Sequence, residues 1–370
     1  MLITQDDLRL IIADVGLDGL MDETIAALEL ALPDESAVAI CPRGGFALEN
    51  ERTGVLEWMP AMRPASVATV KMIAYNPANP QRYGLPTIMG NTAVYDTRTG
   101  ALTALMDATF TTALRTGAAS AVATRRLARP GSSVVGLVGC GAQAVTQLHG
   151  LSRILSVCRV LVYDTDPSVM NSFPARVAFT GLPVEPCELE LLEAASDVIC
   201  TATSAPVGSS PVLRGGPDRL RAGVHINAVG SDLPGKTELP LAVLQAAIVC
   251  PDYMPQAVVE GECQQLSSED IGPCLSELVA SDQNGAFRDQ LTVFDSTGYA
   301  LEDHVVAEVV LGHARRLGAW SPLPLFTGTS DATNPYWLRE PVVPAGAARP
   351  DGVWAGRPGS PDAELLTAST

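Results

Sequence analysis

A glycine-rich segment near the middle of the chain has the spacing of a dinucleotide-binding turn. It follows the apolar run Val134–Val138 and precedes a stretch with helical periodicity, 143–155. In a G-x-G-x-x-A turn the first glycine allows the tight bend, the second lets the backbone approach a pyrophosphate, and the alanine keeps helix and strand close. The helix N-terminus then offers unpaired N–H groups to the phosphates. The cofactor residues predicted here are Gly139, Gly141, Ala142, Gln143 and Ala144.

An acid at the end of the next apolar run favours NAD over NADP. The run Val160–Tyr163 ends at Asp164, 20 residues after Ala144 (164 − 144). A carboxylate at that position accepts hydrogen bonds from the ribose hydroxyls and repels a 2′-phosphate. The alternative is that Asp164 only caps a turn.

Two later apolar runs, Val198–Thr201 and His225–Val229, also end in polar or glycine-rich segments. Ligands of open α/β sheets bind outside the carboxyl ends of the strands. We therefore expect both ends to line the cofactor crevice. The residues predicted to do so are Thr201, Thr203, Ser204, Val229 and Gly230.

Two ionisable side chains are placed where they could act on a substrate. Asp232 lies in a glycine-rich loop after a strand, where a carboxylate could take a proton from an amine, or could simply pair with Lys236. Arg115 lies in mid-helix among small residues, and a buried cation must be compensated. It either pairs with a buried acid, grips a substrate carboxylate through its guanidinium fork, or is a surface or structural arginine.

Three further charged residues, Arg43, Glu57 and Lys71, are ambiguous by themselves. Glu57 and Lys71 interrupt apolar runs, Val55–Met59 and Ala68–Ile73, but strand alternation could point both to solvent.

The predicted secondary structure that carries these residues changes along the chain. Residues 5–31 have helical periodicity, 37–72 alternate short apolar stretches with turns, 75–80 form a loop, and strands follow at 87–95 and 101–106. A helix is expected over 107–128, with Asp107 as its N-cap. Beyond it strands alternate with helices as far as Val293–Asp295, and a helix at 302–317 returns to the first domain.

This order predicts an α/β fold, a Rossmann-type doubly wound parallel sheet beside an α+β domain. The predicted boundaries are 1–128 with 303–338 for the α+β domain, 129–302 for the Rossmann domain, and 339–370 for a mostly disordered tail rich in proline and glycine.

Composition limits the classes of protein. A net charge of −17, from 24 basic and 41 acidic residues, disfavours nucleic acid as a partner. The sequence contains neither an apolar run long enough to span a bilayer nor the features of a signal peptide, so we expect a cytoplasmic protein without a membrane partner. The eight cysteines form no Cys-x-x-Cys pair and are expected to be reduced, and the four histidines have no metal-ligand spacing.

Taken together, four motifs resemble the ornithine cyclodeaminase/μ-crystallin family. They occur in the family's order and cover roughly residues 1–335. The motifs are Gly84–Ile88, Ala113–Ser120, Gly139–Ala144 and Gly230–Leu239. Further segments are more similar to the lysine cyclodeaminases of actinomycetes: Glu57–Pro60, Tyr75–Pro80, Gly141–Gln147, Glu260–Leu266 and Val293–Gly298.

The resemblance implies a reaction and a role for each candidate. L-lysine would become L-pipecolate, or L-ornithine L-proline, with loss of ammonia and with bound NAD as a recycled hydride carrier. Arg115, Arg43 and Lys71 would hold the α-carboxylate, Glu57 would orient the amino end, and Asp232 would be the acid/base residue. Ser296 and Thr297 would approach the nicotinamide, Asn91 would face the substrate, and the α+β domain would form a homodimer. The alternatives are an NAD(P)-dependent amino-acid dehydrogenase or cyclic-imine reductase, and a non-catalytic dinucleotide- and ligand-binding protein.

Overall fold

The computed structural model describes residues 1–48, 54–281, 286–287, 289–326, 328–329 and 331–339. These residues fall into two compact units divided after Ser321. The first contains both β-sheets, and the second contains the short 3-10 helix η5 (Pro335–Arg339). Residues 340–370 of the predicted tail lie outside the described residues. In the described part of the chain, no helix is long and apolar enough to cross a membrane.

The first sheet is mainly antiparallel. Its strand order is β1-β7-β6-β5-β4-β2, and β3 also pairs with β4. Only β1 runs parallel to its neighbour, β7. The strands are β1 (Leu2–Ile3), β2 (Ala39–Ile40), β3 (Gly44–Leu48), β4 (Gly54–Met62), β5 (Val67–Tyr75), β6 (Ile88–Asp96) and β7 (Leu102–Asp107).

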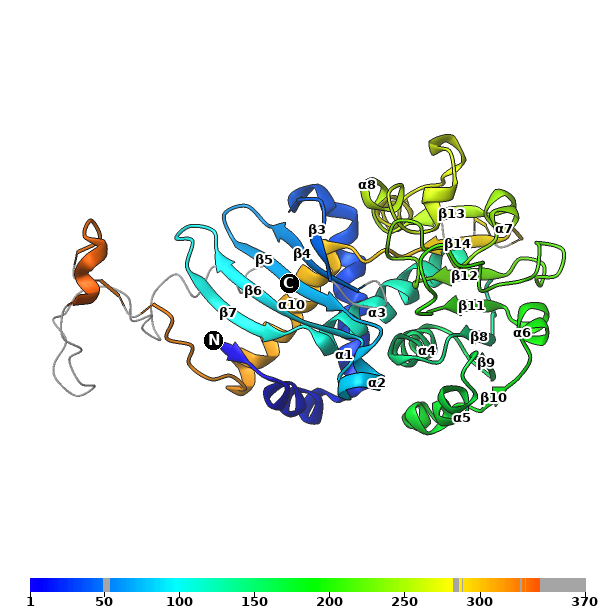
Figure 1. Ribbon diagram of the computed structural model, residues 1–370, viewed down its shortest axis with the longest axis horizontal. Helices are drawn as coiled ribbons and strands as arrows, with labels where there is room; N and C mark the ends of the chain where they lie inside the picture. Colours follow the sequence, from blue (N-terminus) through cyan, green and yellow to red (C-terminus); the bar gives the residue numbers. More distant parts are fainter. Residues whose placement is uncertain (49–53, 282–285, 288, 327, 330, 340–370) are drawn as a thin grey trace. The chain divides into compact units, whose positions relative to one another are not determined.

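Three helices cover one face of this sheet, α1 (Gln5–Ala31), α3 (Thr109–Leu127) and α10 (Ala300–Leu317) (Figure 1). Their apolar side chains form one core with those of the strands. Burying one face of a sheet under helices is the ordinary arrangement of an α+β domain. The helix α10 comes from the far end of the first unit, as the sequence predicts.

Three local predictions need correction. The helix over 5–31 is broken at Gly16, where φ is +81° and the backbone is not helical. The segment expected as a loop at 75–80 runs into a short helix, α2 (Asn79–Tyr83), because Pro80 fits the first turn of a helix. The N-cap of α3 is Ala108, although the Asp107 carboxylate still accepts hydrogen bonds from the N–H groups of Thr109 (3.0 Å) and Phe110 (3.3 Å).

The second sheet is parallel throughout, with the order β10-β9-β8-β11-β12-β14-β13. Its strands are β8 (Val134–Val138), β9 (Arg159–Tyr163), β10 (Val184–Pro186), β11 (Val198–Thr201), β12 (His225–Ala228), β13 (Ile248–Pro251) and β14 (Thr292–Asp295). The strand order reverses between β8 and β11, which is where doubly wound sheets bind ligands.

Helices lie on both faces of the second sheet, so the predicted fold class is confirmed (Figure 1). One apolar core joins the sheet to α4 (Ala142–Ile154) and α5 (Pro167–Arg176). The other joins it to α6 (Leu189–Ala195) and α7 (Leu241–Ala246). The remaining short helices are α8 (Met254–Ala257), α9 (Leu275–Ala280), η1 (Leu32–Ala37), η2 (Ala178–Thr180), η3 (Glu262–Gln265) and η4 (Ser268–Asp270).

The helix α3 connects the two sheets and packs closely on α4. A Cβ placed on Gly117 of α3 would lie 2.2 Å from the carbonyl oxygen of Thr146, and one on Gly150 of α4 would lie 2.4 Å from the carbonyl oxygen of Gly117. Only glycine leaves room for these contacts. The two helices are therefore held against each other by backbone contact.

Candidate active site

The glycine turn has the geometry that a dinucleotide requires. Gly139 has φ +89°, and a Cβ there would lie 2.6 Å from the carbonyl oxygen of Ala202. A Cβ on Gly141 would meet nothing within 4 Å, so the space above the turn is open. No side chain caps the N-terminus of α4, and Ala144 is buried against the sheet. The first-turn N–H groups of α4 are thus not capped by any side chain, as phosphate binding requires.

Asp164 lies directly beside this turn at the end of β9. Its Oδ2 accepts a hydrogen bond from the N–H of Cys140 (2.7 Å), and its Oδ1 accepts one from the N–H of Asp166 (2.9 Å). A carboxylate oxygen has capacity for further donors. The position therefore suits both a turn cap and a ribose ligand.

The predicted cofactor residues at the ends of β11 and β12 are joined by an acid that the sequence analysis did not single out. Glu238 accepts hydrogen bonds from the hydroxyl of Thr201 (2.6 Å), from the N–H and hydroxyl of Thr203 (2.8 and 2.6 Å), and from the N–H of Gly230 (2.9 Å). Glu238 is fully buried. Thr201 and Thr203 therefore use their hydroxyls, and Thr203 also its N–H, to fix the crevice.

Two more buried acids continue this connection. Glu262 accepts hydrogen bonds from the N–H groups of Glu238 (2.7 Å) and Leu239 (3.2 Å). Asp295, at the end of β14, accepts them from the N–H groups of Glu262 and Cys263, both at 2.8 Å. Burial raises the pKa of Glu262 to about 8 and that of Asp295 to about 7. Asp295 thus fixes the segment that carries Glu262, and Glu262 fixes the segment that carries Glu238.

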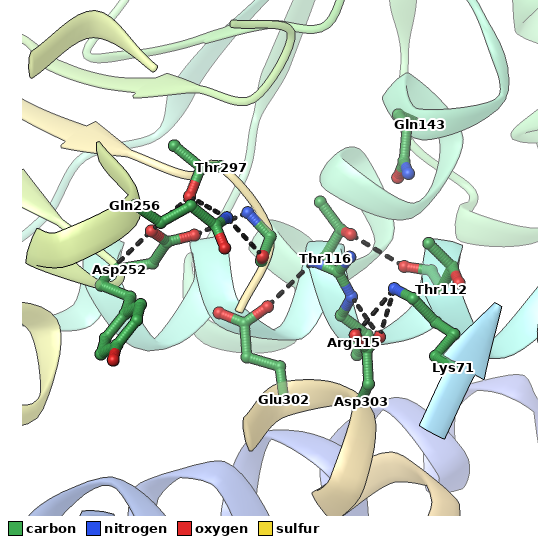
Figure 2. Close-up of polar contacts among 12 residues, drawn as sticks. Lys71, Thr112, Arg115, Thr116, Gln143, Asp252, Gln256, Thr297, Glu302 and Asp303 are labelled. Atoms are coloured by element: carbon green, nitrogen blue, oxygen red, sulfur yellow. Dashed lines mark hydrogen bonds and ion pairs between the residues drawn. The ribbon is translucent and has the colours of Figure 1, made fainter. Parts of the chain in front are cut away.

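A fourth buried acid, Asp252, holds the segment after β14. It accepts hydrogen bonds from the hydroxyl of Thr297 (2.9 Å) and the N–H of Gly298 (2.7 Å), as Figure 2 shows. The neighbouring Ser296 has a buried hydroxyl that finds no hydrogen-bond partner within the described ranges. The Ser296 hydroxyl at the end of β14 is therefore available to a dinucleotide bound across the carboxyl ends of the strands.

Lys71 and Arg115 meet over two buried acids (Figure 2). The Nζ of Lys71 lies 2.7 Å from both carboxylate oxygens of Asp303. Arg115 donates from Nε to Asp303 (3.1 Å) and from Nη1 to Glu302 (2.9 Å). Both cations are almost fully buried. Strand alternation therefore points Lys71 inward, and Arg115 does pair with buried acids.

Burial shifts the protonation of this cluster. It lowers the pKa of Lys71 to about 8, assisted by the nearby Arg115 and opposed by Asp303. It raises the pKa of Glu302 to about 8 against the attraction of Arg115. Burial also acts to raise the pKa of Asp303, but Lys71 and Arg115 outweigh it and leave that pKa below its usual value. The Nη2 of Arg115 has no hydrogen-bond partner among the described residues, so one edge of its guanidinium can take an anion.

Arg43, just before β3 of the first sheet, contacts the loop that follows β14 of the second sheet. Its Nη2 donates to the carbonyl oxygens of Thr297 (2.6 Å) and Gly298 (2.9 Å). Its Nη1 lies 3.5 Å from Glu57 and 3.2 Å from Glu260. A charged side chain from the first sheet thus fixes the loop after the last strand of the second.

Glu57, Glu260 and Asp232 surround the other side of Arg43. Arg43 and both glutamates line a cleft of about 420 Å³, to which Leu233 and Pro234 also contribute, next to Asp232 in the chain. Asp232 forms an ion pair of 2.8 Å with Lys236, as the alternative interpretation of its loop expected. Burial raises the pKa of Glu57, and Arg43 opposes that shift. Glu260 was not predicted, because an isolated glutamate before a glycine carries no sequence signal of burial.

The structure separates Asn91 from this cluster. In the register of β5 and β6, Thr92 pairs with Lys71 and Asn91 pairs with Met72. Adjacent strand residues point to opposite faces. Asn91 is exposed, whereas Thr92 is buried on the Lys71 side. The geometry therefore disagrees with the expected contact between Asn91 and the substrate, and Thr92 takes that position instead.

The remaining predicted cofactor residues lie along the same crevice edge. Gln143, on α4, points toward the group formed by Lys71, Arg115 and Thr116 (Figure 2). Ala142 and Ser204 are exposed, and Val229 is buried at the end of β12. The turn, the strand ends and the cation pair thus belong to one site.

This fold and site are those of a dinucleotide-binding α/β protein with two buried cations, Lys71 and Arg115, near the loop that follows β14. The chain belongs to the ornithine cyclodeaminase/mu-crystallin family, whose model matches residues 6–317. The predicted family is thereby confirmed.

Three relatives define the similarity more closely. L-lysine cyclodeaminase of Streptomyces rapamycinicus is 42% identical over 342 residues, which cover 90% of this chain and 98% of that protein. A solved lysine cyclodeaminase, studied for recognition of L-lysine, L-ornithine and L-2,4-diaminobutyric acid, is 48% identical with a TM-score of 0.88, covering 91% of this chain and 98% of the other. An archaeal alanine dehydrogenase, solved as a dimer with bound NAD, is 33% identical with a TM-score of 0.77, covering 88% and 99%. The NAD-bound relative supports the predicted cofactor.

Proposed function

We propose that the protein is an NAD-dependent amino-acid cyclodeaminase, an ammonia-lyase that converts L-lysine to L-pipecolate, or L-ornithine to L-proline, and releases ammonia. The observation that carries this proposal is the position of Arg115 and Lys71, two buried cations beside the loop that follows β14. The similarity to two lysine cyclodeaminases supports the choice of a diamino acid.

The chain's own residues account for binding. The free edge of Arg115 and the ammonium of Lys71 bind the α-carboxylate, and Arg43 adds positive charge from the opposite side of Gly298. A guanidinium and an ammonium suit a carboxylate because charge-assisted hydrogen bonds are the stronger kind. Residues 139–144, Asp164 and the 296–297 segment hold NAD. When bound there, NAD would supply the hydride acceptor for Cα and the hydride donor for the cyclic imine.

Proton transfer falls to the acids on the cleft side. Asp232 takes the proton of the terminal amine, which can attack Cα only in its neutral form. Glu57, which also contacts Arg43, orients that amine. The α-amino group leaves as ammonia, and the atoms balance: a diamino acid gives a cyclic imino acid and one ammonia. The buried pocket excludes water from the reacting carbon.

One assay separates the proposal from its rivals. The protein is incubated with L-lysine or L-ornithine and substoichiometric NAD⁺, and ammonia and NADH absorbance are followed together. Ammonia without net NADH supports a cyclodeaminase. A net change in NADH supports an amino-acid dehydrogenase or an imine reductase, the first being the activity named for the archaeal relative. If neither changes with any diamino acid, the proposed function is wrong.

We also propose the predicted division into a substrate domain (1–128 with 303–338) and a cofactor domain (129–302), with homodimerisation through the first sheet. The face of that sheet away from the helices carries a mostly apolar surface, half-buried or exposed in the single chain, with the polar Asn91 among its members. Large uncovered apolar surfaces mark protein interfaces. Its apolar members are Leu56, Trp58, Pro60, Met62, Ala68, Val70, Met72, Ala74, Met89, Ala93 and Tyr95.

A further inference from the structure

We propose that Glu260 determines specificity by binding the terminal ammonium of the diamino acid, so that the cleft side of Arg43 accepts the cationic end of the substrate. This inference rests on the proposed function and adds a residue to it.

The local charges favour a cation at this position. Glu57 and Glu260 lie against Arg43, and Asp232 lies against Lys236. Three carboxylates thus share two positive side chains. Because both glutamates are largely buried, water poorly compensates this excess of negative charge. An incoming ammonium would restore the balance.

Glu260 lines the cleft and has hydrogen-bonding capacity that no described residue uses. Its side chain is only 8% exposed and lines the 420 Å³ cavity. The Oε1 of Glu260 finds no hydrogen-bond partner within the described part of the chain, although it lies 3.2 Å from the Nη1 of Arg43. Buried polar atoms are rarely left unpaired in a functional complex. A substrate ammonium, with three N–H donors, would supply the partner.

The opposite orientation of the substrate fits less well. Both terminal nitrogens of Arg43 already face acceptors: two carbonyl oxygens at Nη2, and two carboxylates at Nη1. A substrate carboxylate placed on the cleft side would lie against Glu57 and Glu260. On the other side, two cations, Lys71 and Arg115, balance the two carboxylates of Asp303 and Glu302, and the Nη2 of Arg115 has no hydrogen-bond partner among the described residues. The site is therefore polarised, with the anion end toward Arg115 and the cation end toward Glu260.

Protonation of Glu260 provides a second readout. The pKa of Glu260 is raised to about 7, chiefly by burial; Arg43 opposes the shift, and Glu57, Asp232 and Asp252 add to it. Below pH 7 the carboxyl group becomes neutral and should bind an ammonium less well. As the pH is lowered through this range, the affinity for L-lysine should decrease, whereas the affinity for an amino acid without a terminal amine should not change.

The test compares L-lysine with L-norleucine, which has the same chain length but no terminal amine. Calorimetry of the full chain loaded with NADH, which cannot accept a hydride and so prevents turnover of L-lysine, measures both affinities in the wild type, in Glu260→Gln and in Glu260→Asp, with the exposed Glu269→Gln as the matched control. Glu260→Gln should weaken L-lysine about 10- to 100-fold, as expected for a lost charged hydrogen bond, should leave L-norleucine within twofold, and should abolish the pH dependence. Glu260→Asp should keep part of the discrimination.

Three results would overturn the inference: equal weakening of both ligands, no weakening of either, or a wild type that does not prefer L-lysine. Thermal unfolding and NAD affinity show whether each variant is folded, and the same comparison is made with Glu260→Asp if Glu260→Gln does not fold. Because calorimetry measures binding, its outcome is independent of turnover. A wild type that binds L-lysine through Glu260 but releases no ammonia would contradict the proposed function and leave this inference standing.

Discussion

Arg43, which precedes β3, and Arg115, on α3, both reach Gly298 in the loop after β14. A Cβ on Gly298 would lie 2.9 Å from the Nη2 of Arg115 and 3.2 Å from the Nη2 of Arg43. Gly298 also has φ +90°, a conformation that other residues adopt with difficulty. The absence of a side chain at this position therefore lets two guanidinium groups share one small space.

Replacing this glycine should reduce substrate binding. In Gly298→Ala the new methyl group displaces both guanidinium groups, so we expect kcat/KM for the diamino acid to fall at least tenfold, while NAD affinity changes less. The matched control is Gly318→Ala, which has φ +66° but no atom within 4 Å of the new Cβ. Both variants should lose about 1 kcal/mol of stability from the left-handed backbone. A similar activity loss in the control would refute the steric explanation.

Asp232→Asn separates the two interpretations of that residue. If Asp232 is the acid/base residue, turnover should fall by roughly 10²–10⁴-fold with NAD binding retained. If Asp232 only compensates the buried Lys236, then Lys236→Met should remove the need for the acid, and the double variant should recover turnover. Steady-state ammonia release from both single variants and the double variant decides between them. Near-normal turnover in Asp232→Asn alone would falsify the catalytic role.

Lys71 should make substrate binding sensitive to alkaline pH. Its pKa is lowered to about 8, chiefly by burial. As pH rises through 8 the ammonium loses its proton, and with it the charge that attracts the α-carboxylate, so KM should increase. Lys71→Met should have a KM about 10- to 100-fold higher, without the step near pH 8. Titration of the substrate's own amines is common to both proteins, so the comparison between them isolates Lys71.

Glu238→Gln should loosen the cofactor crevice. The amide still accepts hydrogen bonds through its oxygen, but its NH₂ group faces the donors of Thr203 or Gly230. Leaving buried donors unpaired costs about 1–3 kcal/mol each. Urea denaturation should show a loss of this size, with weaker NAD binding by fluorescence. The exposed Glu190→Gln serves as the control, and unchanged NAD affinity in Glu238→Gln would contradict the proposed support of the crevice.

Trp58→Glu tests the dimer. Trp58 lies on the apolar sheet face beside Met72. A charge placed there cannot be buried without a partner, so association should weaken strongly. Light scattering after size-exclusion chromatography should detect a dimer for the wild type and a monomer for the variant. A wild type that is monomeric at micromolar concentration would contradict the proposed dimer.

The structure could be predicted from the sequence where ligand binding and local backbone geometry depend on the same few residues. The strand, turn and helix around Gly139 and Gly141 were predicted within one or two residues, because such a turn needs both glycines and a following helix end. The fold class followed from the alternation of strands and helices. The break at Gly16 was missed because an isolated glycine is tolerated within helical periodicity.

Side-chain direction and burial of acids were harder to predict. Asn91 and Thr92 are adjacent, and only the pairing of β6 with β5 decides which of them faces Lys71. Glu238, Glu262 and Glu260 look like surface glutamates in the sequence, because acids are seldom buried. Their partners are backbone N–H groups and an arginine far away in the chain, which local patterns do not reveal.

The contact between Gly117 and Gly150 bears on how such proteins diverge. It makes Arg115 on α3, the proposed carboxylate ligand, and the N-terminus of α4, the proposed phosphate site, parts of one stiff block, so the reacting carbon and the dinucleotide should keep a constant separation whatever the amino acid. Adaptation to a longer or shorter chain must then come from outside this block. The loops that carry Asp232 and Glu260 are the places where natural variation or directed evolution can change substrate length without disturbing hydride transfer.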